Sequence, residues 1–253
     1  MTGTRGFIDF AAGDQQAHAA GVQRHEHLKA WLASSGPKYG LPDRLQDLDD
    51  VGRETLLDLY TTETQTSLTI EELAPPRSLR LPRLRFEVSS SAGLKKTSAN
   101  FLALLADEKK LVSKRAPNPP LRYQGTPVFR IEADFVAQTG DVTRRDGSGG
   151  ESIYGGTFKD EPEGLKTLFQ KGTLAMANSG KNCELNLSSL LFFVTLADDP
   201  AKLKKLTGRY VAFGQVDLLD HDSARCLDEL NALADGKGGI AGPVWIEECG
   251  IET

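Results

Sequence analysis

The sequence predicts an all-β domain, a sandwich or a barrel, that also carries a helical segment. Short apolar stretches separated by glycine and proline recur from residue 123 onward, as in folds built from many short strands. Residues 15–79 differ, because their apolar positions have helical spacing. The composition, 39% hydrophobic and 26% charged, is that of an ordinary globular protein and excludes bulk disorder.

The first elements are a predicted strand and two predicted helices. Residues 6–12 are an apolar run that ends at a Gly-Asp turn signal. Asp14 is a suitable N-cap for a helix that extends to about Ser35, where Gly36-Pro37 ends it. A second helix is expected to bury one side, made of Leu48, Val51, Leu56, Leu59 and Tyr60.

The remaining elements are mostly short strands. Residues 84–88 alternate apolar and charged, which predicts a strand with one buried face. Residues 96–105 are expected to form a helix that Thr97 or Ser98 caps, with Phe101, Leu104 and Leu105 buried. A last helix is predicted at 226–233. The further predicted strands are 128–131, 135–138, 173–177, 190–195, 211–216 and 244–247.

The charge of the chain argues against a nucleic-acid partner. It has 30 Lys and Arg against 35 Asp and Glu, a formal net charge of −5, whereas phosphate backbones attract basic surfaces. Basic residues between 109 and 120 fit either a docking patch or a solvated loop. No apolar run reaches the roughly 20 residues that span a bilayer, and the first residues lack the apolar region of a signal peptide. We therefore expect no membrane and no secretory leader.

The cysteines and histidines favour free side chains over a metal site. Cys183, Cys226 and Cys249 are odd in number and none lies in a C-x-x-C pair, which favours free thiols in a reducing, cytoplasmic compartment. His18 and His25 are seven residues apart and could share a helical face, but no third ligand stands near them. We expect no metal site.

A set of long motifs resembles one family. Residues 96–101 read KTSANF, residues 128–141 VFRIEADFVAQTGD, residues 143–155 TRRDGSGGESIYG, residues 174–180 LAMANSG, residues 192–195 FFVT, residues 206–214 LTGRYVAFG and residues 243–250 PVWIEECG. In order and spacing over residues 81–253, these motifs resemble those of the cyclophilins. The resemblance implies a closed eight-stranded antiparallel barrel capped by two helices. It also implies peptidyl-prolyl cis–trans isomerase activity without metal or cofactor.

The helical segment is interpreted as an insertion. Residues 6–10 resemble the first strand of the family and residues 84–88 its hairpin partner. Residues 15–79 would then lie within the first hairpin of a single domain that spans 1–253. Such insertions are tolerated, because each doubling of loop length costs about 0.6 kcal/mol. The alternative, a helical extension before a complete barrel, leaves residues 6–10 unexplained.

The resemblance also assigns roles to individual residues. Arg130 matches the catalytic arginine, whose guanidinium stays charged and offers donors in a rigid plane. Gln138 matches the glutamine that binds the substrate and helps to hold the arginine. An apolar wall and a backbone that pairs with the peptide complete the site. The expected substrate-binding residues are Phe129, Phe135, Val136, Gln138, Ala177, Asn178, Phe193, Leu206 and Tyr210.

Several residues depart from the family pattern. Phe129 stands where the family has histidine, Val136 where it has methionine, Leu191 where it has glutamine and Tyr210 where histidine is common. Residues 181–189 form a loop about four residues longer than usual. Lys205 aligns where many members carry the tryptophan that contacts cyclosporin. We therefore expect weak or no cyclosporin binding.

Two functions remain open from the sequence. One is an active isomerase that acts on X–Pro bonds in proline-containing segments of client proteins. The other is a catalytically weak or inactive cyclophilin-like module that binds proline-containing peptides or takes part in assembly. The helices of the insertion are expected either to pack on the barrel or to offer an apolar face to a protein partner. The chain is expected to be monomeric.

Overall fold

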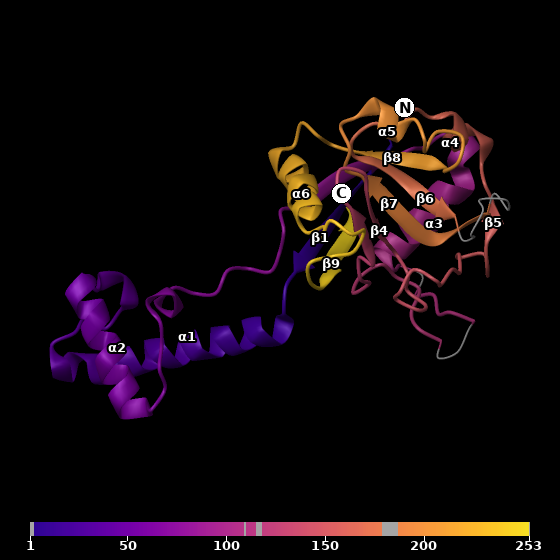
Figure 1. Cartoon of the computed structure of the whole chain (residues 1–253). Coiled ribbons are helices and arrows are strands. Elements are labelled where there is room, and N and C mark those ends of the chain that lie inside the picture. Colours follow the sequence, from indigo (N-terminus) through magenta and orange to yellow (C-terminus); the bar gives the residue numbers. More distant parts are fainter. Residues whose placement is uncertain (1–2, 109, 115–117, 179–186, 253) are drawn as a thin grey trace. The chain divides into compact units, whose positions relative to one another are not determined.

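The computed structural model describes residues 3–108, 110–114, 118–178 and 187–252. The chain divides into two units, each described by itself below (Figure 1). The barrel unit comprises Met1–Ala12 and Arg80–Thr253, and the helical unit comprises Gly13–Leu79.

The barrel unit is built on one antiparallel sheet. Its pairing order is β3-β4-β7-β6-β8-β2-β1-β9, and β5 pairs with β7 beside this path. Within the described residues the strands are β1 (Thr4–Ala12), β2 (Leu84–Val88), β3 (Arg130–Glu132), β4 (Val136–Thr139), β5 (Phe158–Lys159), β6 (Thr173–Asn178), β7 (Leu187–Thr195), β8 (Ala212–Val216) and β9 (Val244–Ile251). The predicted all-β class is confirmed, although the sequence did not indicate the two-residue strand β5.

The sheet curls so that its two ends approach each other. The segment that leads into β3 is hydrogen-bonded to β9, the strand at the opposite end of the path. The amide of Val128 donates to the carbonyl of Val244 at 2.8 Å, and the amide of Ile246 donates to the carbonyl of Thr126 at 2.9 Å. The result is the barrel-like sheet of Figure 1.

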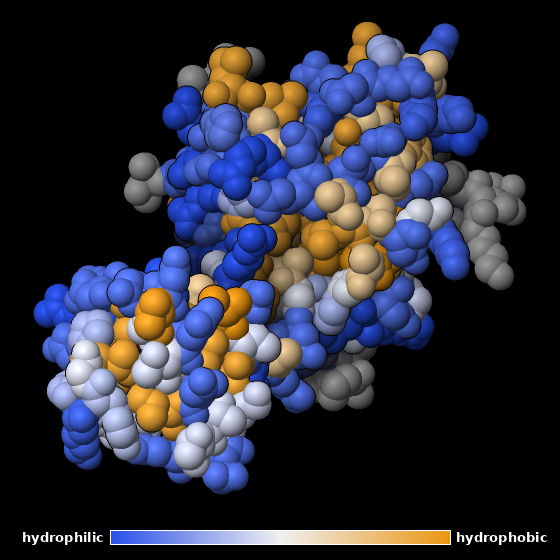
Figure 2. All heavy atoms as spheres, turned by 60° about the vertical axis from the view of Figure 1, so that its left-hand side comes forward, coloured by the Kyte–Doolittle hydropathy of each residue, from blue (hydrophilic) through white to orange (hydrophobic). Residues whose placement is uncertain are grey.

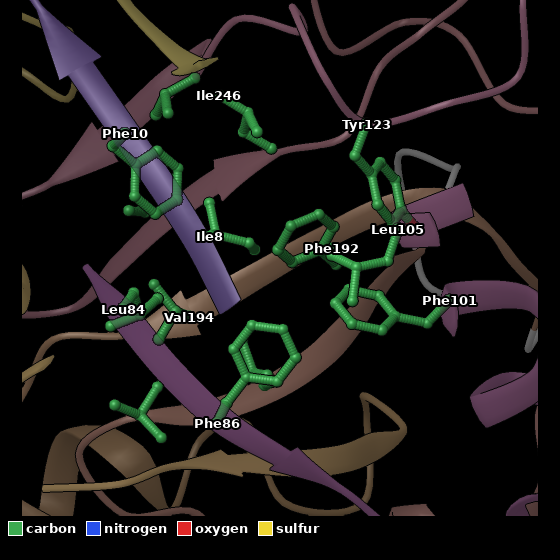
Figure 3. Packing of buried hydrophobic residues seen from close by; sticks show 14 of the residues in the cluster. Ile8, Phe10, Leu84, Phe86, Phe101, Leu105, Tyr123, Phe192, Val194 and Ile246 are labelled. Atoms are coloured by element: carbon green, nitrogen blue, oxygen red, sulfur yellow. The ribbon is translucent and has the colours of Figure 1, made fainter. Parts of the chain in front are cut away.

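The interior of the curled sheet holds the main hydrophobic core (Figure 3). Alternate residues of the strands point inward, as the period of two requires. Phe101 lies at the centre, because its ring centroid is 4.7–5.7 Å from those of Phe86, Tyr123, Phe192 and Phe213. Aromatic packing of this kind contributes beyond the buried area alone.

Two longer helices cover the barrel. α3 (Lys95–Ala106) buries Phe101, Leu104 and Leu105 as predicted, and α6 (His221–Ala232) buries Cys226, Leu227 and Leu230. The short helices α4 (Pro162–Lys166) and α5 (Pro200–Leu203) each begin with proline and were not predicted. Four or five residues are too few for a recognisable helical period.

The predicted cap of α3 is wrong. Neither Thr97 nor Ser98 caps the helix, whose N-cap position is Leu94. The carboxylate of Glu161 accepts hydrogen bonds from the amides of Lys96 and Thr97, at 3.0 and 2.8 Å. A distant acidic side chain thus satisfies the amides that a local cap would bind.

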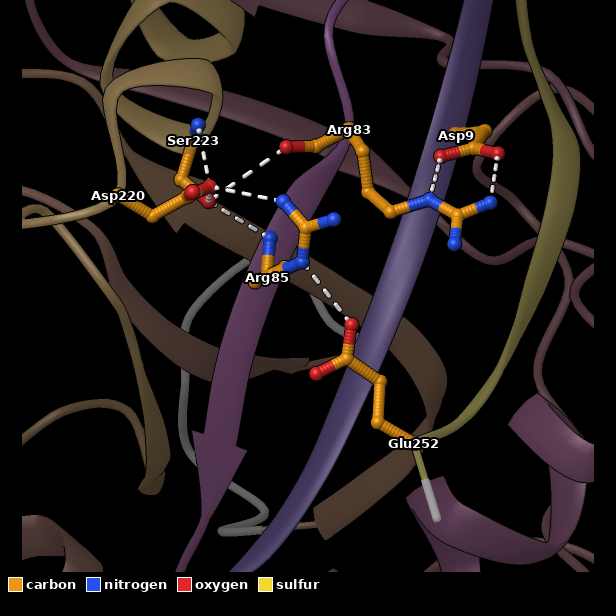
Figure 4. A network of polar contacts seen from close by, with 6 residues as sticks. All are labelled: Asp9, Arg83, Arg85, Asp220, Ser223 and Glu252. Atoms are coloured by element: carbon orange, nitrogen blue, oxygen red, sulfur yellow. Dashed lines mark hydrogen bonds and ion pairs between the residues drawn. The ribbon is translucent and has the colours of Figure 1, made fainter.

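A polar network ties β1 and β2 to the start of α6 and to Glu252, the residue after β9 (Figure 4). The buried carboxylate of Asp9 accepts two hydrogen bonds from Arg83, at 2.8 and 2.7 Å. Arg85 bonds to Asp220 at 3.1 Å and to Glu252 at 3.0 Å. Hydrogen bonds from Ser223 and the nearby guanidinium of Arg85 lower the pKa of Asp220, which is the N-cap of α6.

The helical unit has a small core of its own. α1 (Gln15–Ser35) begins at its predicted N-cap Asp14 and α2 (Asp50–Thr64) is capped by Asp49. The single-turn helices η1 (Gly36–Tyr39), η2 (Leu45–Asp47) and η3 (Ile70–Leu73) lie around them. The buried cluster comprises Leu28, Leu32, Leu48, Leu56, Tyr60 and Leu68.

One residue of the predicted buried side is exposed. Val51 is 72% exposed, so its assignment to that side is wrong. The buried stripe of α2 instead follows Gly52, Leu56 and Tyr60, spaced by four residues. Val51 precedes this stripe by one position, which turns it about 100° away around the helix.

The chain leaves the sheet and returns to it at neighbouring positions. β1 pairs with β2 from Thr4↔Val88 to Ile8↔Leu84, and the pairing continues as a bridge between Ala11 and Arg80. The amide of Leu81 also donates to the carbonyl of Phe10 at 2.8 Å. The helical unit therefore connects two adjacent strands.

In the part of the chain that the structure describes, none of the helices combines the length and apolar character needed to cross a membrane.

Candidate functional site

The predicted site residues meet on the outer face of the sheet. Arg130 on β3 is paired with Gln138 on β4, which is paired with Phe193 on β7, which is paired with Ala175 on β6. Directly paired residues share a face of the sheet. The intervening residues, such as Ile131 and Phe192, point into the barrel core instead. The site is therefore a consequence of strand alternation.

An apolar cluster covers this outer face, and we call it the outer cluster. Phe193 lies at its centre, with the ring of Tyr210 edge-on at 5.2 Å and that of Phe169 stacked at 6.2 Å. Its buried members are Val136, Phe169, Ala175, Ala177, Leu191, Phe193, Ala197, Leu203, Leu206 and Ala212, and its partly buried members are Phe129, Phe135 and Tyr210. Every apolar or aromatic site residue predicted from the sequence belongs to this cluster.

Most of the predicted apolar wall is covered. Phe193 is 1% exposed, Val136 2% and Leu206 5%. Phe129, Phe135 and Tyr210 are only partly buried. The apolar surface that faces solvent near Arg130 is therefore provided by aromatic residues at the edge of the cluster rather than by its centre.

Arg130 is exposed and is held by two neighbours. Its Nη1 donates to Oε1 of Gln138 at 3.2 Å, a contact that the family resemblance implied. Its Nη2 donates to Oε2 of Glu132 at 2.5 Å, an ion pair whose side chains are 44% and 43% exposed. Sequence reasoning missed Glu132. The signal was present, because opposite charges two residues apart on a strand share a face.

The loop after β4 is organised around a buried carboxylate. Asp141 accepts hydrogen bonds from the amides of Arg144, Gly147 and Gly149 at 2.9, 2.8 and 3.0 Å. Burial raises the pKa of this carboxyl group, but the amide donors outweigh it, so its pKa lies below the usual range. Asp141 stays ionised at neutral pH and keeps its donors in place.

This loop packs against Phe129. Gly147 has φ of +86°, and a Cβ at this position would meet the Phe129 ring at 2.5 Å. A glycine is therefore required both by the backbone conformation and by the close approach. The phenylalanine that stands where the family has histidine is seated against the loop.

Two predictions fall near residues that the structure does not describe. Asn178 is the last residue of β6, and its backbone is paired with Ser188 of β7. Most of the predicted long loop 181–189 lies outside the described residues, as does Cys183. Lys109 and residues 115–117 of the basic stretch also lie outside them.

No metal centre is found among the described residues, where no group of three or more His, Cys, Asp and Glu side chains is arranged to hold an ion. The site offers a guanidinium, an amide side chain and an apolar surface. These groups can donate and accept hydrogen bonds and can pack against apolar parts of a peptide.

Comparison with known proteins identifies the family. The sequence profile described as "Cyclophilin type peptidyl-prolyl cis-trans isomerase/CLD" matches residues 88–251. The chain belongs to the cyclophilin family. Arg130 and the outer cluster lie within the matched region, so the candidate site is part of the cyclophilin domain.

Named cyclophilin relatives agree with this assignment. Peptidyl-prolyl cis-trans isomerase cyp11 of Rhizopus delemar is 41% identical over 121 residues, 48% of this chain and 32% of that protein. Peptidyl-prolyl cis-trans isomerase CYP21-1 of Arabidopsis thaliana is 36% identical over 147 residues, 58% of this chain and 57% of that protein.

A longer protein also contains a similar region. E3 SUMO-protein ligase RanBP2 of Pan troglodytes is 32% identical over 170 residues, 67% of this chain but 4% of that protein. The chain thus covers about a third of the Rhizopus isomerase, somewhat more than half of the Arabidopsis isomerase and a small part of the ligase.

Proposed function

We propose that this chain is a peptidyl-prolyl cis–trans isomerase that accelerates rotation about X–Pro bonds in proline-containing segments of client proteins. The observation that carries the proposal is the Arg130–Gln138 pair at the edge of the outer cluster, within the region that matches the cyclophilin profile. A cation held in place beside an apolar surface can bind a proline-containing segment and stabilise its X–Pro amide as that amide rotates, without cleaving it.

The chemistry needs only differential binding. Amide resonance opposes rotation about the X–Pro bond with a barrier of about 18–20 kcal/mol. When the amide twists, the proline nitrogen loses conjugation and gains a lone pair that can accept a hydrogen bond. Arg130 donates to this nitrogen or to the neighbouring carbonyl, and so binds the twisted amide more tightly than the planar one. No nucleophile, metal or cofactor takes part.

The other predicted residues hold the peptide in place. Gln138 keeps the guanidinium of Arg130 oriented and hydrogen-bonds to the substrate backbone. Asn178 pairs with the peptide through its backbone at the end of β6. The proline ring packs on the aromatic edge formed by Phe129, Phe135 and Tyr210. Because Phe129 and Val136 depart from the family pattern, the preference for the residue before proline should differ from that of other cyclophilins.

The test is an isomerisation assay on a short X–Pro peptide. The wild-type chain should accelerate the reaction above the uncatalysed rate, and the Arg130→Ala variant should lose most of that acceleration. If both proteins leave the reaction at the uncatalysed rate, the enzymatic proposal is wrong.

A second candidate function is a binding or assembly module with weak or no activity. Two observations favour it. The central wall residues, Phe193 above all, are covered, and Arg130 is paired with an anion. Such a protein would bind proline-containing peptides in calorimetry or NMR titration without accelerating their isomerisation. The same isomerisation assay therefore separates the two candidates.

We expect cyclosporin to bind weakly or not at all. Lys205, which aligns where many cyclophilins carry the tryptophan that contacts this inhibitor, is an exposed lysine in the structure. An exposed ammonium cannot supply the apolar area or the N–H of an indole ring. Calorimetry should detect no binding at micromolar concentration. A nanomolar affinity would show that this contact is dispensable or that the alignment at Lys205 is wrong.

We propose that residues 15–79 are an insertion within one cyclophilin domain and that they bind a partner protein. The helical unit has a groove of about 740 Å³, whose lining includes His25 and the basic residues Lys29, Arg44 and Arg53, against one acidic residue, Asp43. Figure 2 shows apolar side chains gathered on the forward face of this unit. Ile70, which is 54% exposed, and Leu73 also line the groove.

The lining favours a segment with both acidic and apolar side chains. Lys29 and Arg53 are paired with Glu26 and Asp50, but such exposed pairs are weak and can be exchanged for a partner's carboxylates. In NMR titrations of the full chain, a peptide that alternates Glu and Leu should shift the signals of Arg44 and Ile70. A Lys–Leu peptide is the control. If both peptides shift these signals equally, or neither does, the proposed groove recognition is wrong.

We also propose a monomer in the cytoplasm. Cys226 and Cys249 are free thiols, and burial raises the pKa of Cys249 to about 12, which keeps this thiol protonated and unreactive. Light scattering and cell fractionation test the two parts of this proposal. A stable dimer, or recovery in a membrane or secreted fraction, would contradict it.

A further inference from the structure

Glu132 places a negative charge directly beside the proposed catalytic cation. Arg130 and Glu132 are the first and last residues of β3, so their side chains share the outer face of the sheet. The Nη2–Oε2 contact is 2.5 Å, and both side chains are about half exposed. The guanidinium that would face the peptide is therefore not an isolated positive charge.

We infer that Glu132 determines which charge a substrate can carry on the residue before proline. This inference rests on the proposed function, because it assumes that Arg130 contacts the X–Pro amide. A hydrogen bond between Arg130 and that amide spans about 3 Å. The Glu132 carboxylate, which touches the same guanidinium, then lies within about 8 Å of the amide, even where a different guanidinium nitrogen donates to that amide. The side chain of the preceding residue starts one bond from that amide and reaches this distance.

The sign of the effect follows from the charges. With Arg130 alone, the site would attract an acidic residue before proline and repel a basic one. Glu132 opposes that preference and shifts it towards a lysine or arginine over a glutamate. At this separation in a half-exposed site, charge–charge interactions alter rates by about three- to tenfold, and salt screens them.

The experiment compares two blocked peptides, Ala-Lys-Pro-Phe and Ala-Glu-Pro-Phe. Isomerisation is measured by NMR exchange, which does not depend on a protease with its own charge preference. The quantity of interest is the ratio of kcat/KM for the lysine peptide to that for the glutamate peptide. It is measured for the wild type, for Glu132→Gln, which keeps the shape and an acceptor oxygen, and for Glu87→Gln.

Glu87 is a matched control. It is an exposed glutamate on β2, a strand separated from β4 by β7, β6 and β8 in the sheet order. We expect Glu132→Gln to lower the lysine-to-glutamate ratio by about three- to tenfold at low salt and by less at high salt. The Glu87→Gln ratio should equal that of the wild type.

Other outcomes overturn the inference. An unchanged ratio in Glu132→Gln means that the carboxylate has no influence on substrate charge. An equal loss of rate for both peptides means that Glu132 only positions Arg130. If the wild type does not catalyse the reaction, the proposed function fails, and the ratio of the two dissociation constants then tests the inference. The inference is wrong if the chain binds neither peptide. It is also wrong if Glu132→Gln leaves the ratio of the two dissociation constants unchanged.

Discussion

Replacing Arg130 with alanine is expected to lower kcat/KM for X–Pro isomerisation by about 10²- to 10³-fold, the effect of removing one preorganised donor from a developing charge. The substitution removes the only side chain proposed to bind the twisted amide better than the planar one. Gln138 and the outer cluster would still bind the peptide. The loss should therefore appear mainly in kcat, with a smaller change in KM.

Arg130→Lys is the informative companion. Lysine keeps the positive charge but replaces a planar fork by a single ammonium. It cannot donate to Gln138 and to the substrate in the same fixed geometry, so we expect a loss of about tenfold or more, between wild type and alanine. NMR exchange rates on one X–Pro peptide measure all three proteins.

Folding provides the control for this comparison. The Arg130 side chain is 44% exposed and its ion pair with Glu132 lies at the surface. Both substitutions should therefore change the free energy of unfolding by less than about 1 kcal/mol. An alanine variant that folds normally and retains the wild-type rate would exclude Arg130 as the source of catalysis.

The barrel could be predicted where a strand has one buried face. Leu84–Val88 alternates apolar and charged residues and forms β2 at those bounds. Val128 was predicted to begin a strand that in fact begins at Arg130. Its amide is bonded to β9 instead, a contact between segments more than 100 residues apart. Strand ends depend on such long-range pairing, which the local pattern does not contain.

Helix ends, like strand ends, could be predicted only where the deciding contact is local in the sequence. Asp14 caps α1 as predicted. Its carboxylate accepts hydrogen bonds from amides two and three residues further along the chain, so the local sequence contained the signal. The amides at the start of α3 are bound by Glu161, more than 60 residues away. No local signal could have distinguished that arrangement from a cap by Thr97 or Ser98.

At the site, the family motif placed the residues and strand alternation explains why they meet. Phe193, one of the expected substrate-binding residues, lies at the centre of the outer cluster and is covered by Phe169 and Tyr210. Phe169 was missed because it lies in a loop with no motif. Glu132 was missed although its spacing from Arg130 indicated a shared face.

Replacing Arg83 with alanine is expected to destabilise the barrel unit by about 3 kcal/mol, the lower end of the range for breaking a buried ion pair. Asp9 has a side chain that is 6% exposed, and Arg83 satisfies both of its oxygens. Without Arg83, the ion-pair partner that this carboxylate retains among the described residues is Arg80, at 3.4 Å. The lower end applies because Arg83 itself is 34% exposed and its charge is partly solvated.

The matched control is Arg80→Ala. Arg80 also contacts Asp9, and it contacts Glu248 at 3.2 Å, but its side chain is 50% exposed. Exposed pairs contribute about 0–1 kcal/mol, so this variant should be nearly as stable as the wild type. Two arginines bonded to one carboxylate are thus expected to differ several-fold in their effect on stability.

The measurement needs a reporter confined to the barrel unit. The chain has two tryptophans, of which Trp31 lies in the helical unit and Trp245 on β9. In a Trp31→Phe background, urea denaturation followed by fluorescence reports on the barrel alone. The cation–π contact of Arg83 over the Phe7 ring, at 3.9 Å, is lost together with the ion pair.

A double variant separates the two contributions. If the unpaired carboxylate dominates, Asp9→Asn combined with Arg83→Ala should recover part of the stability lost in Arg83→Ala, because the remaining side chain is neutral. If the stacking on Phe7 dominates, the double variant should be no more stable than Arg83→Ala. Equal losses in Arg80→Ala and Arg83→Ala would contradict both explanations, since the two-oxygen contact with Asp9 and the stacking on Phe7 belong to Arg83.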